Sequence, residues 1–174
     1  FDIPDLQLLP IGYYGIVILV ALASGLAGVI FNWGLLNIGR FYSLPCFKRP
    51  VQKIAFALIC TGILGYFLPE VLGGGNELIN HLAKAPVSLQ LLLLFLAGKL
   101  IFTLISYGCG VPGGFFLPML VIGALCGSIC AQILIMLGWI EPAYATNIMV
   151  VAMAALFASS VRAPITGTVL IMEM

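Results

Sequence analysis

A glycine- and proline-rich segment interrupts the longest uncharged stretch of this chain. No charged residue lies between Lys99 and Glu141, yet residues 108–118, here called the broken-helix loop, contain four glycines and two prolines. Such an apolar run belongs inside a bilayer, where unwound backbone is tolerated only if protein buries it or it lines a polar cavity. A helix can resume near Phe116, and its first N–H groups would lack carbonyl partners. These donors and the helix dipole predict an uncharged site for an anion, as in the discontinuous helices of transport proteins.

The composition is that of a membrane protein. Of the 174 residues, 63% are hydrophobic and 7% are charged, whereas soluble domains carry about 25% charged residues. We therefore predict an all-α integral membrane protein in which residues 1–174 form a single transmembrane domain. The net charge of +1 provides no basic field for nucleic acid. Because Phe1 has no signal peptide before it and Met174 falls inside an apolar helical pattern, we expect a piece truncated at both ends.

The polar residues do not form a metal site or a catalytic site. The chain has one histidine, His81, and five cysteines without a CxxC pair, so neither a metal nor a cofactor is expected. No Ser-His-Asp set surrounds His81 and no carboxylates are closely paired, so an enzyme is not expected either.

Apolar runs separated by glycine and proline define the expected helices. A second break falls at residues 159–164, where Pro164 suits the first turn of a new helix. Gly123, Gly127 and Ala131 recur every four residues and predict a helix-packing face. The predicted helices cover residues 11–39, 51–68, 76–83, 88–106, 116–137, 144–160 and 163–174.

Charge placement gives two further predictions. Residues 40–53 hold four of the seven basic residues and should face the cytoplasm. Lys99 stands alone in an apolar segment. An intramembrane cation is a functional candidate, but a lysine that snorkels or pairs with a carboxylate or helix-end carbonyls is an equal alternative.

Glycines outside the helix-packing face have two expected roles. The glycines at 73–75 favour a flexible turn over a phosphate cradle, because no Lys-Ser or Lys-Thr follows them. Gly113 and Gly114 should let the backbone of the broken-helix loop bend without a β-carbon clash.

Two sequence blocks resemble the signature of the CLC family of chloride channels and chloride/proton antiporters. Residues 110–118, followed by Gly123-Ala124 and Gly127, match the family's Pro-(Gly/Ser)-Gly step, Gly-x-Phe-x-Pro segment and Gly-Ala-x-x-Gly helix. Residues 160–167, with Glu173 beyond them, resemble its Ser-x-Arg-Ala-Pro-Leu-Thr-Gly segment. The triple glycine and Lys99 also fall where the family has a glycine cluster and a basic residue.

The resemblance implies the broken and tilted helices of an inverted-repeat fold, of which this chain would be most of the second half. It implies that backbone amides of Phe115 and Phe116 bind the anion, with Gly114 and Pro118 shaping the helix start. The family's gating glutamate and filter tyrosine have no counterpart in this chain. A homodimer is also implied, with only the helix from Pro164 at its interface. The implied anion-site residues are Gly114, Phe115, Phe116, Leu117 and Pro118, and the implied loop-shaping residues are Gly110, Pro112 and Gly113.

Transport of chloride by the parent protein, a multi-pass protein of the plasma or inner membrane, is therefore the leading hypothesis. A purely structural helical domain without an ion site is the alternative, and an intramembrane enzyme is disfavoured. The sequence leaves open whether the parent is a passive channel or a proton-coupled antiporter, and which anion it prefers. A Gly-Arg-Glu-Gly-Pro-like segment in the upstream sequence of the full gene would decide the class.

Overall fold

The computed structural model describes residues 8–44, 47, 49–84, 87–111 and 113–172. Within these residues the chain is helical and contains no strand, as predicted. Each of the seven predicted helices is present, with ends within a few residues of those expected. The helices are α1 (Tyr14–Phe41), α2 (Pro50–Phe67), α3 (Asn76–Lys84), α4 (Leu89–Gly108), α5 (Phe116–Met136), α6 (Ala145–Val161) and α7 (Pro164–Met172), and short 3₁₀ turns are η1 (Ile11–Tyr13), η3 (Pro69–Val71) and η4 (Pro142–Tyr144).

Five helical segments of the described chain are long and apolar enough to cross a membrane. A crossing of the hydrocarbon core needs about 20 predominantly apolar residues. The segments that meet this need are Ile11–Phe41, Pro50–Phe67, Leu89–Gly108, Phe116–Met136 and Pro142–Val161.

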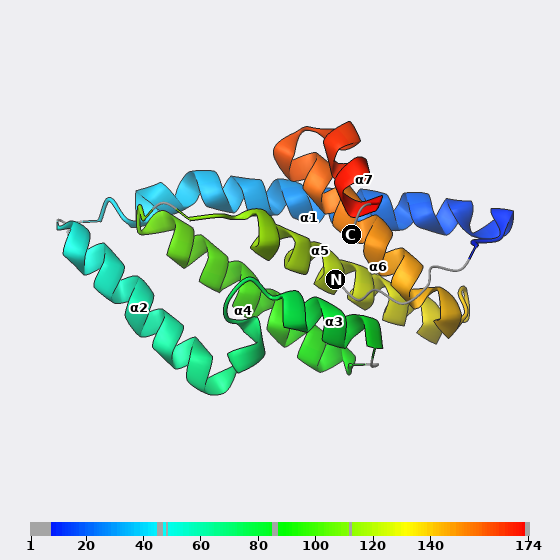
Figure 1. Cartoon of the computed structure of the whole chain (residues 1–174), viewed down its shortest axis with the longest axis horizontal. Helices are drawn as coiled ribbons and strands as arrows, with labels where there is room; N and C mark the ends of the chain where they lie inside the picture. The colour runs from blue at the N-terminus through cyan, green and yellow to red at the C-terminus, as the bar shows by residue number, and fades with distance from the viewer. Residues whose placement is uncertain (1–7, 45–46, 48, 85–86, 112, 173–174) are drawn as a thin grey trace.

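Helix α5 is the centre of the packing. It lies between α4 and α6 and also contacts α1 and α3 (Figure 1). Residues 119–125 are all buried, so this helix is covered around its circumference and shows little amphipathic pattern. A membrane helix this enclosed is positioned by its protein neighbours, which fixes the place of its N-terminus.

Small residues allow α5 and α6 to approach closely. A Cβ added to Gly123 would lie 2.7 Å from Met153 Cα, and one added to Gly127 would lie 2.6 Å from Met149 Cα. Real side chains do not tolerate such distances, so both positions require glycine in this crossing. The predicted small-residue face is thereby confirmed.

Helix α1 packs against α6 nearer to the C-terminal end of α6. Gly28 sits at the crossing, where a methyl group would overlap Ser159 Oγ, and Ser160 Oγ donates to the Gly28 carbonyl at 3.4 Å. Helix α6 then ends at Val161, Arg162 takes a left-handed conformation at φ 59°, and α7 starts at Pro164. The predicted second break is present at this corner.

Helix α2 stands apart from this core. It contacts α4 and η3 and buries only Ala57, and in Figure 1 it diverges from the other helices. Its large apolar side chains are exposed, as are many on α1. Faces of this kind suit contact with lipid or with further protein.

Candidate functional site

The C-terminal end of α4 is fixed just before the broken-helix loop. Tyr42, the residue after α1, is buried and its hydroxyl donates to the Ile105 carbonyl at 2.9 Å. Burial, with smaller contributions from Cys109 and Cys60, raises the pKa of Tyr42 to about 12. A Cβ at Gly108 would lie 2.6 Å from the Tyr42 ring. The loop therefore leaves α4 from an anchored point.

The glycines of the loop differ in backbone conformation. Gly110 has φ +85°, a left-handed conformation that favours glycine. Gly114 does not have positive φ, and a Cβ there would meet nothing within 4 Å among the described residues. The described chain therefore shows no β-carbon clash that Gly114 avoids, and for Gly113, which follows an undescribed residue, the expected role stays a prediction. Pro112 lies outside the described residues.

The predicted helix restart is at Phe116. Phe115 is the N-cap, and its carbonyl accepts the first helical hydrogen bond from the Met119 N–H at 3.1 Å. No side chain caps this end. Phe115, Phe116 and Leu117 donate no backbone hydrogen bond to any other described residue, and Pro118 has no N–H to donate. Within the described residues, these three adjacent backbone donors have no partner, and they lie at the end of the helix where its dipole is positive.

Solvent exposure decreases sharply from Phe115 to Met119. Phe115 is exposed, Phe116 to Pro118 are partly exposed, and Met119 onward is buried. The Phe115 ring packs edge-on against Tyr107 at 5.8 Å between centroids, while the Phe116 ring packs edge-on against Phe157 of α6 at 5.5 Å. The two phenylalanine side chains therefore contact different neighbours, and their backbone is held between α4 and α6.

Lys99 holds a second backbone segment against this site. Its side chain is 0% exposed. Its ammonium group donates to the carbonyls of Val71, the last residue of η3, and Gly73, both at 2.8 Å. Of the two predicted kinds of partner, a carboxylate or helix-end carbonyls, the described structure shows backbone carbonyls, and that of Val71 is at a helix end. Within the described chain no carboxylate lies in ion-pair contact with Lys99.

Two glycines of the triple-glycine turn (residues 73–75) pack against α5. Gly73 and Gly75 have φ of +66° and +84°. A Cβ at Gly75 would lie 2.5 Å from a Val121 methyl group and 3.3 Å from Lys99 Nζ, and one at Gly74 would lie 3.1 Å from Leu117. The absence of side chains thus lets this turn lie directly on the first turns of α5.

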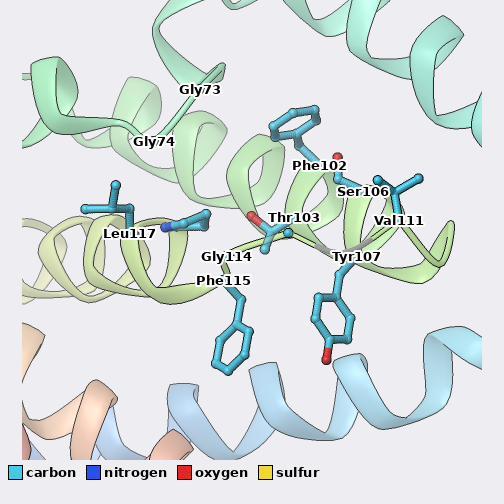
Figure 2. A pocket seen from close by; sticks show the side chains of 12 residues that line it. Gly73, Gly74, Phe102, Thr103, Ser106, Tyr107, Val111, Gly114, Phe115 and Leu117 are labelled. Carbon is cyan, nitrogen blue, oxygen red and sulfur yellow. The ribbon is translucent and has the colours of Figure 1, made fainter.

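The broken-helix loop, the triple-glycine turn and α4 line an open cavity of about 310 Å³. Figure 2 shows the triple-glycine turn on one side of it and the loop at Gly114 on another, with α4 side chains between them. The lining combines apolar groups, hydroxyls and glycine backbone, and contains no acidic side chain. The lining residues are Gly73, Gly74, Phe102, Thr103, Ser106, Tyr107, Val111, Gly113, Gly114, Phe115, Leu117 and Pro118.

The structure thus brings the predicted residues Gly113, Gly114, Phe115, Leu117 and Pro118 to one cavity. Gly110 and Phe116 belong to the same segment but are not part of the lining. The prediction missed Thr103, Ser106 and Tyr107. Their spacing from Lys99, at i+4, i+7 and i+8, places them on or near one face of α4, a pattern that could have linked them to the lysine.

The arrangement matches known proteins. The family model described as "Voltage gated chloride channel" matches residues 1–174. The chain is 35% identical over 183 residues to the H(+)/Cl(-) exchange transporter ClcA of Vibrio cholerae, covering 100% of this chain and 37% of the relative. It is 34% identical over 172 residues to the ClcA transporter of Salmonella agona, covering 95% of this chain and 36% of that protein.

A solved structure supports the same relationship. The crystal structure of a slow cyanobacterial Cl⁻/H⁺ antiporter superposes with a TM-score of 0.82 at 26% identity, over 98% of this chain and 40% of that one. The chain spans about 37% of the length of the curated relatives that it matches. Together with the five apolar helical segments, this similarity to transporters identifies an integral membrane protein.

Proposed function

This chain belongs to the voltage gated chloride channel family, and we propose that the complete protein carries chloride across a membrane. The observation that carries the proposal is the restart of α5. The N–H groups of Phe115, Phe116 and Leu117 have no partner among the described residues and lie at the start of an uncharged helix. In this proposal residues 1–174 supply one side of the anion site, and the rest of the protein supplies the other.

The physical reason is electrostatic. A helix N-terminus carries roughly half a positive charge, and a low dielectric strengthens its attraction for an anion. Among the described residues, no lysine or arginine lines the cavity. A fixed cation there would hold chloride tightly and slow its release, whereas conduction needs an ion that can also leave. Backbone amides supply attraction of the intermediate strength that transport requires.

We further propose that transport is an exchange of chloride for protons. The named activity of the curated relatives and of the solved structure favours exchange over a passive channel. The complete protein would act without an enzymatic step or a cofactor, in the cell membrane. It would work as a homodimer, with α7 (Pro164–Met172) as the part of this chain at the subunit contact.

Chloride flux from liposomes containing the complete protein tests the first proposal. Gly114→Val is the informative variant, because the described chain leaves open space at this Cβ and the added side chain lies beside the proposed donors. Gly62→Val is the matched control, since Gly62 of α2 also has open space around its Cβ. We expect flux to be lost in the first and kept in the second. Normal flux in folded Gly114→Val protein would contradict the site.

The second proposal is tested with the same liposomes. An imposed chloride gradient should drive protons against their own gradient if the two ions are exchanged. Chloride movement without proton movement would identify a passive channel. If the wild-type protein moves no anion at all, a structural role without an ion site becomes the better account.

A further inference from the structure

One hydroxyl beside the broken-helix loop has no partner. Thr103 is 5% exposed, lines the cavity, and its Oγ1 makes no hydrogen bond to the rest of the described chain. Two other buried polar atoms share this property, on Ser24 and Asn80, but neither residue lines the cavity. Figure 2 shows the Thr103 hydroxyl directed toward the side where Leu117 and the triple-glycine turn lie.

The missing hydrogen bond is unusual for a helical threonine. Such a hydroxyl ordinarily donates to the carbonyl one turn earlier in its own helix. Thr61 of α2 does this, with Oγ1 2.8 Å from the Ala57 carbonyl. Thr103 does not, although it occupies a helix of the same kind. A buried unpaired hydroxyl costs free energy, so its retention points to a partner that binds in the cavity.

The charges around the cavity favour a negatively charged partner. Lys99 lies one turn before Thr103 on α4, and its ammonium donates to Gly73, which lines the cavity. Lys99 has no carboxylate in ion-pair contact within the described residues, so its positive charge is uncompensated there. The lining residues include no acidic side chain that would oppose an anion. The helix dipole at the start of α5 adds to the positive potential.

We propose that this cavity binds a halide ion and that the Thr103 hydroxyl is its side-chain ligand, beside the amides of the broken-helix loop. The inference rests on the proposed anion transport and adds a ligand from α4 to it. In helices threonine occupies two side-chain rotamers, so a small rotation can turn the hydroxyl fully toward an entering ion. The largely apolar lining suits a weakly hydrated monovalent ion, because an oxyanion such as phosphate needs more charged donors.

Bromide diffraction tests the position of the ion directly. Crystals of the complete protein grown in bromide should show an anomalous peak within hydrogen-bond distance of Thr103 Oγ1. A peak only at the Phe115 and Phe116 amides, a water in place of the ion, or a cavity filled by another part of the protein would overturn the role of Thr103.

Binding measurements on matched variants give a second test. Thr103→Val removes the hydroxyl at nearly constant volume, Thr103→Ser keeps it, and Thr61→Val removes a hydroxyl outside the cavity. Because a hydrogen bond to a charged group is worth at least about tenfold in affinity, we expect Thr103→Val to weaken bromide binding by about that factor. The serine variant and the Thr61 control should bind like the wild type.

Thermal unfolding separates this effect from misfolding. Without halide, Thr103→Val should unfold at the wild-type temperature or above it, because an unsatisfied buried hydroxyl has been removed. Added bromide should then stabilise it less than the wild type. If bromide stabilises both equally, Thr103 is not a ligand although the transport proposal stands. If bromide does not bind the wild type, the transport proposal itself fails.

Discussion

Replacing Lys99 by methionine should damage the stability of this protein more than its choice of anion. The change removes two hydrogen bonds from the ammonium group, to the carbonyls of Val71 and Gly73. Methionine has a similar length and volume, so no large cavity is left. The effect therefore comes from the two carbonyls and from the loss of a buried charge.

The size of the effect follows from burial. The hydrogen bond to Val71 is buried, whereas the hydrogen bond to Gly73 is partly buried. After the substitution, the Gly73 carbonyl can therefore accept a hydrogen bond from water. Leaving one buried acceptor unpaired costs about 1–3 kcal/mol. Removing the ammonium also removes its desolvation penalty, which offsets part of this cost. We therefore expect a net loss of about 1–2 kcal/mol, from the lower part of that range.

The assay is thermal unfolding of the complete protein in detergent, followed by anion flux in liposomes. Lys99→Arg serves as the control, because it keeps the charge and the donors and should be milder. Removing a charge affects chloride and bromide alike, so the ratio of their fluxes should be unchanged. A Lys99→Met protein with wild-type stability and an altered flux ratio would refute the anchoring role.

Two other predictions concern the triple-glycine turn and the membrane orientation. Gly75→Ala should lower the free energy of unfolding by about 2–5 kcal/mol, because strain in the left-handed backbone conformation adds to overpacking against Val121. Gly73→Ala, which has the same strain and open space, should cost only about 1–2 kcal/mol, and equal unfolding temperatures for the two would contradict this difference. Residues 40–53 should face the cytoplasm, so Cys46, which lies outside the described residues, should resist a membrane-impermeant thiol reagent in intact cells. Labelling of Cys46 from outside intact cells would show that residues 40–53 face the opposite side of the membrane.

The helices and their breaks could be predicted because the signals are local. Apolar runs end at glycine and proline. Within a bilayer each run must form a helix, because only a helix pairs all of its backbone N–H and C=O groups within the segment. The restart at Phe116, the second break at Pro164 and the packing face at Gly123 and Gly127 all follow from this. The sequence predicts that Lys99 has hydrogen-bond acceptors, because a buried ammonium group needs them. It does not predict that the acceptors are the carbonyls of Val71 and Gly73.

The reason for each glycine could not be predicted from its position in a motif. Gly113 and Gly114 were expected to avoid a clash, yet Gly114 has open space around its Cβ in the described structure, whereas a Cβ would clash at Gly75 and the positive φ of the loop occurs at Gly110. Backbone angles and contacts depend on how distant helices meet, which no local pattern encodes. Thr103 was overlooked for a similar reason: hydroxyls are common in membrane helices, and only the tertiary structure reveals one without a partner.

The central claim is that a backbone donor at the start of α5 binds the anion. An amide-to-ester substitution at Phe116 tests it most directly, because it removes this N–H and leaves the phenylalanine side chain in place. The measurement is calorimetric chloride binding to the complete protein, with an ester at Ile129 in the middle of α5 as the control. We predict that affinity falls about tenfold or more for the Phe116 ester and stays near wild type for the control. Wild-type affinity in the folded Phe116 ester would contradict the account.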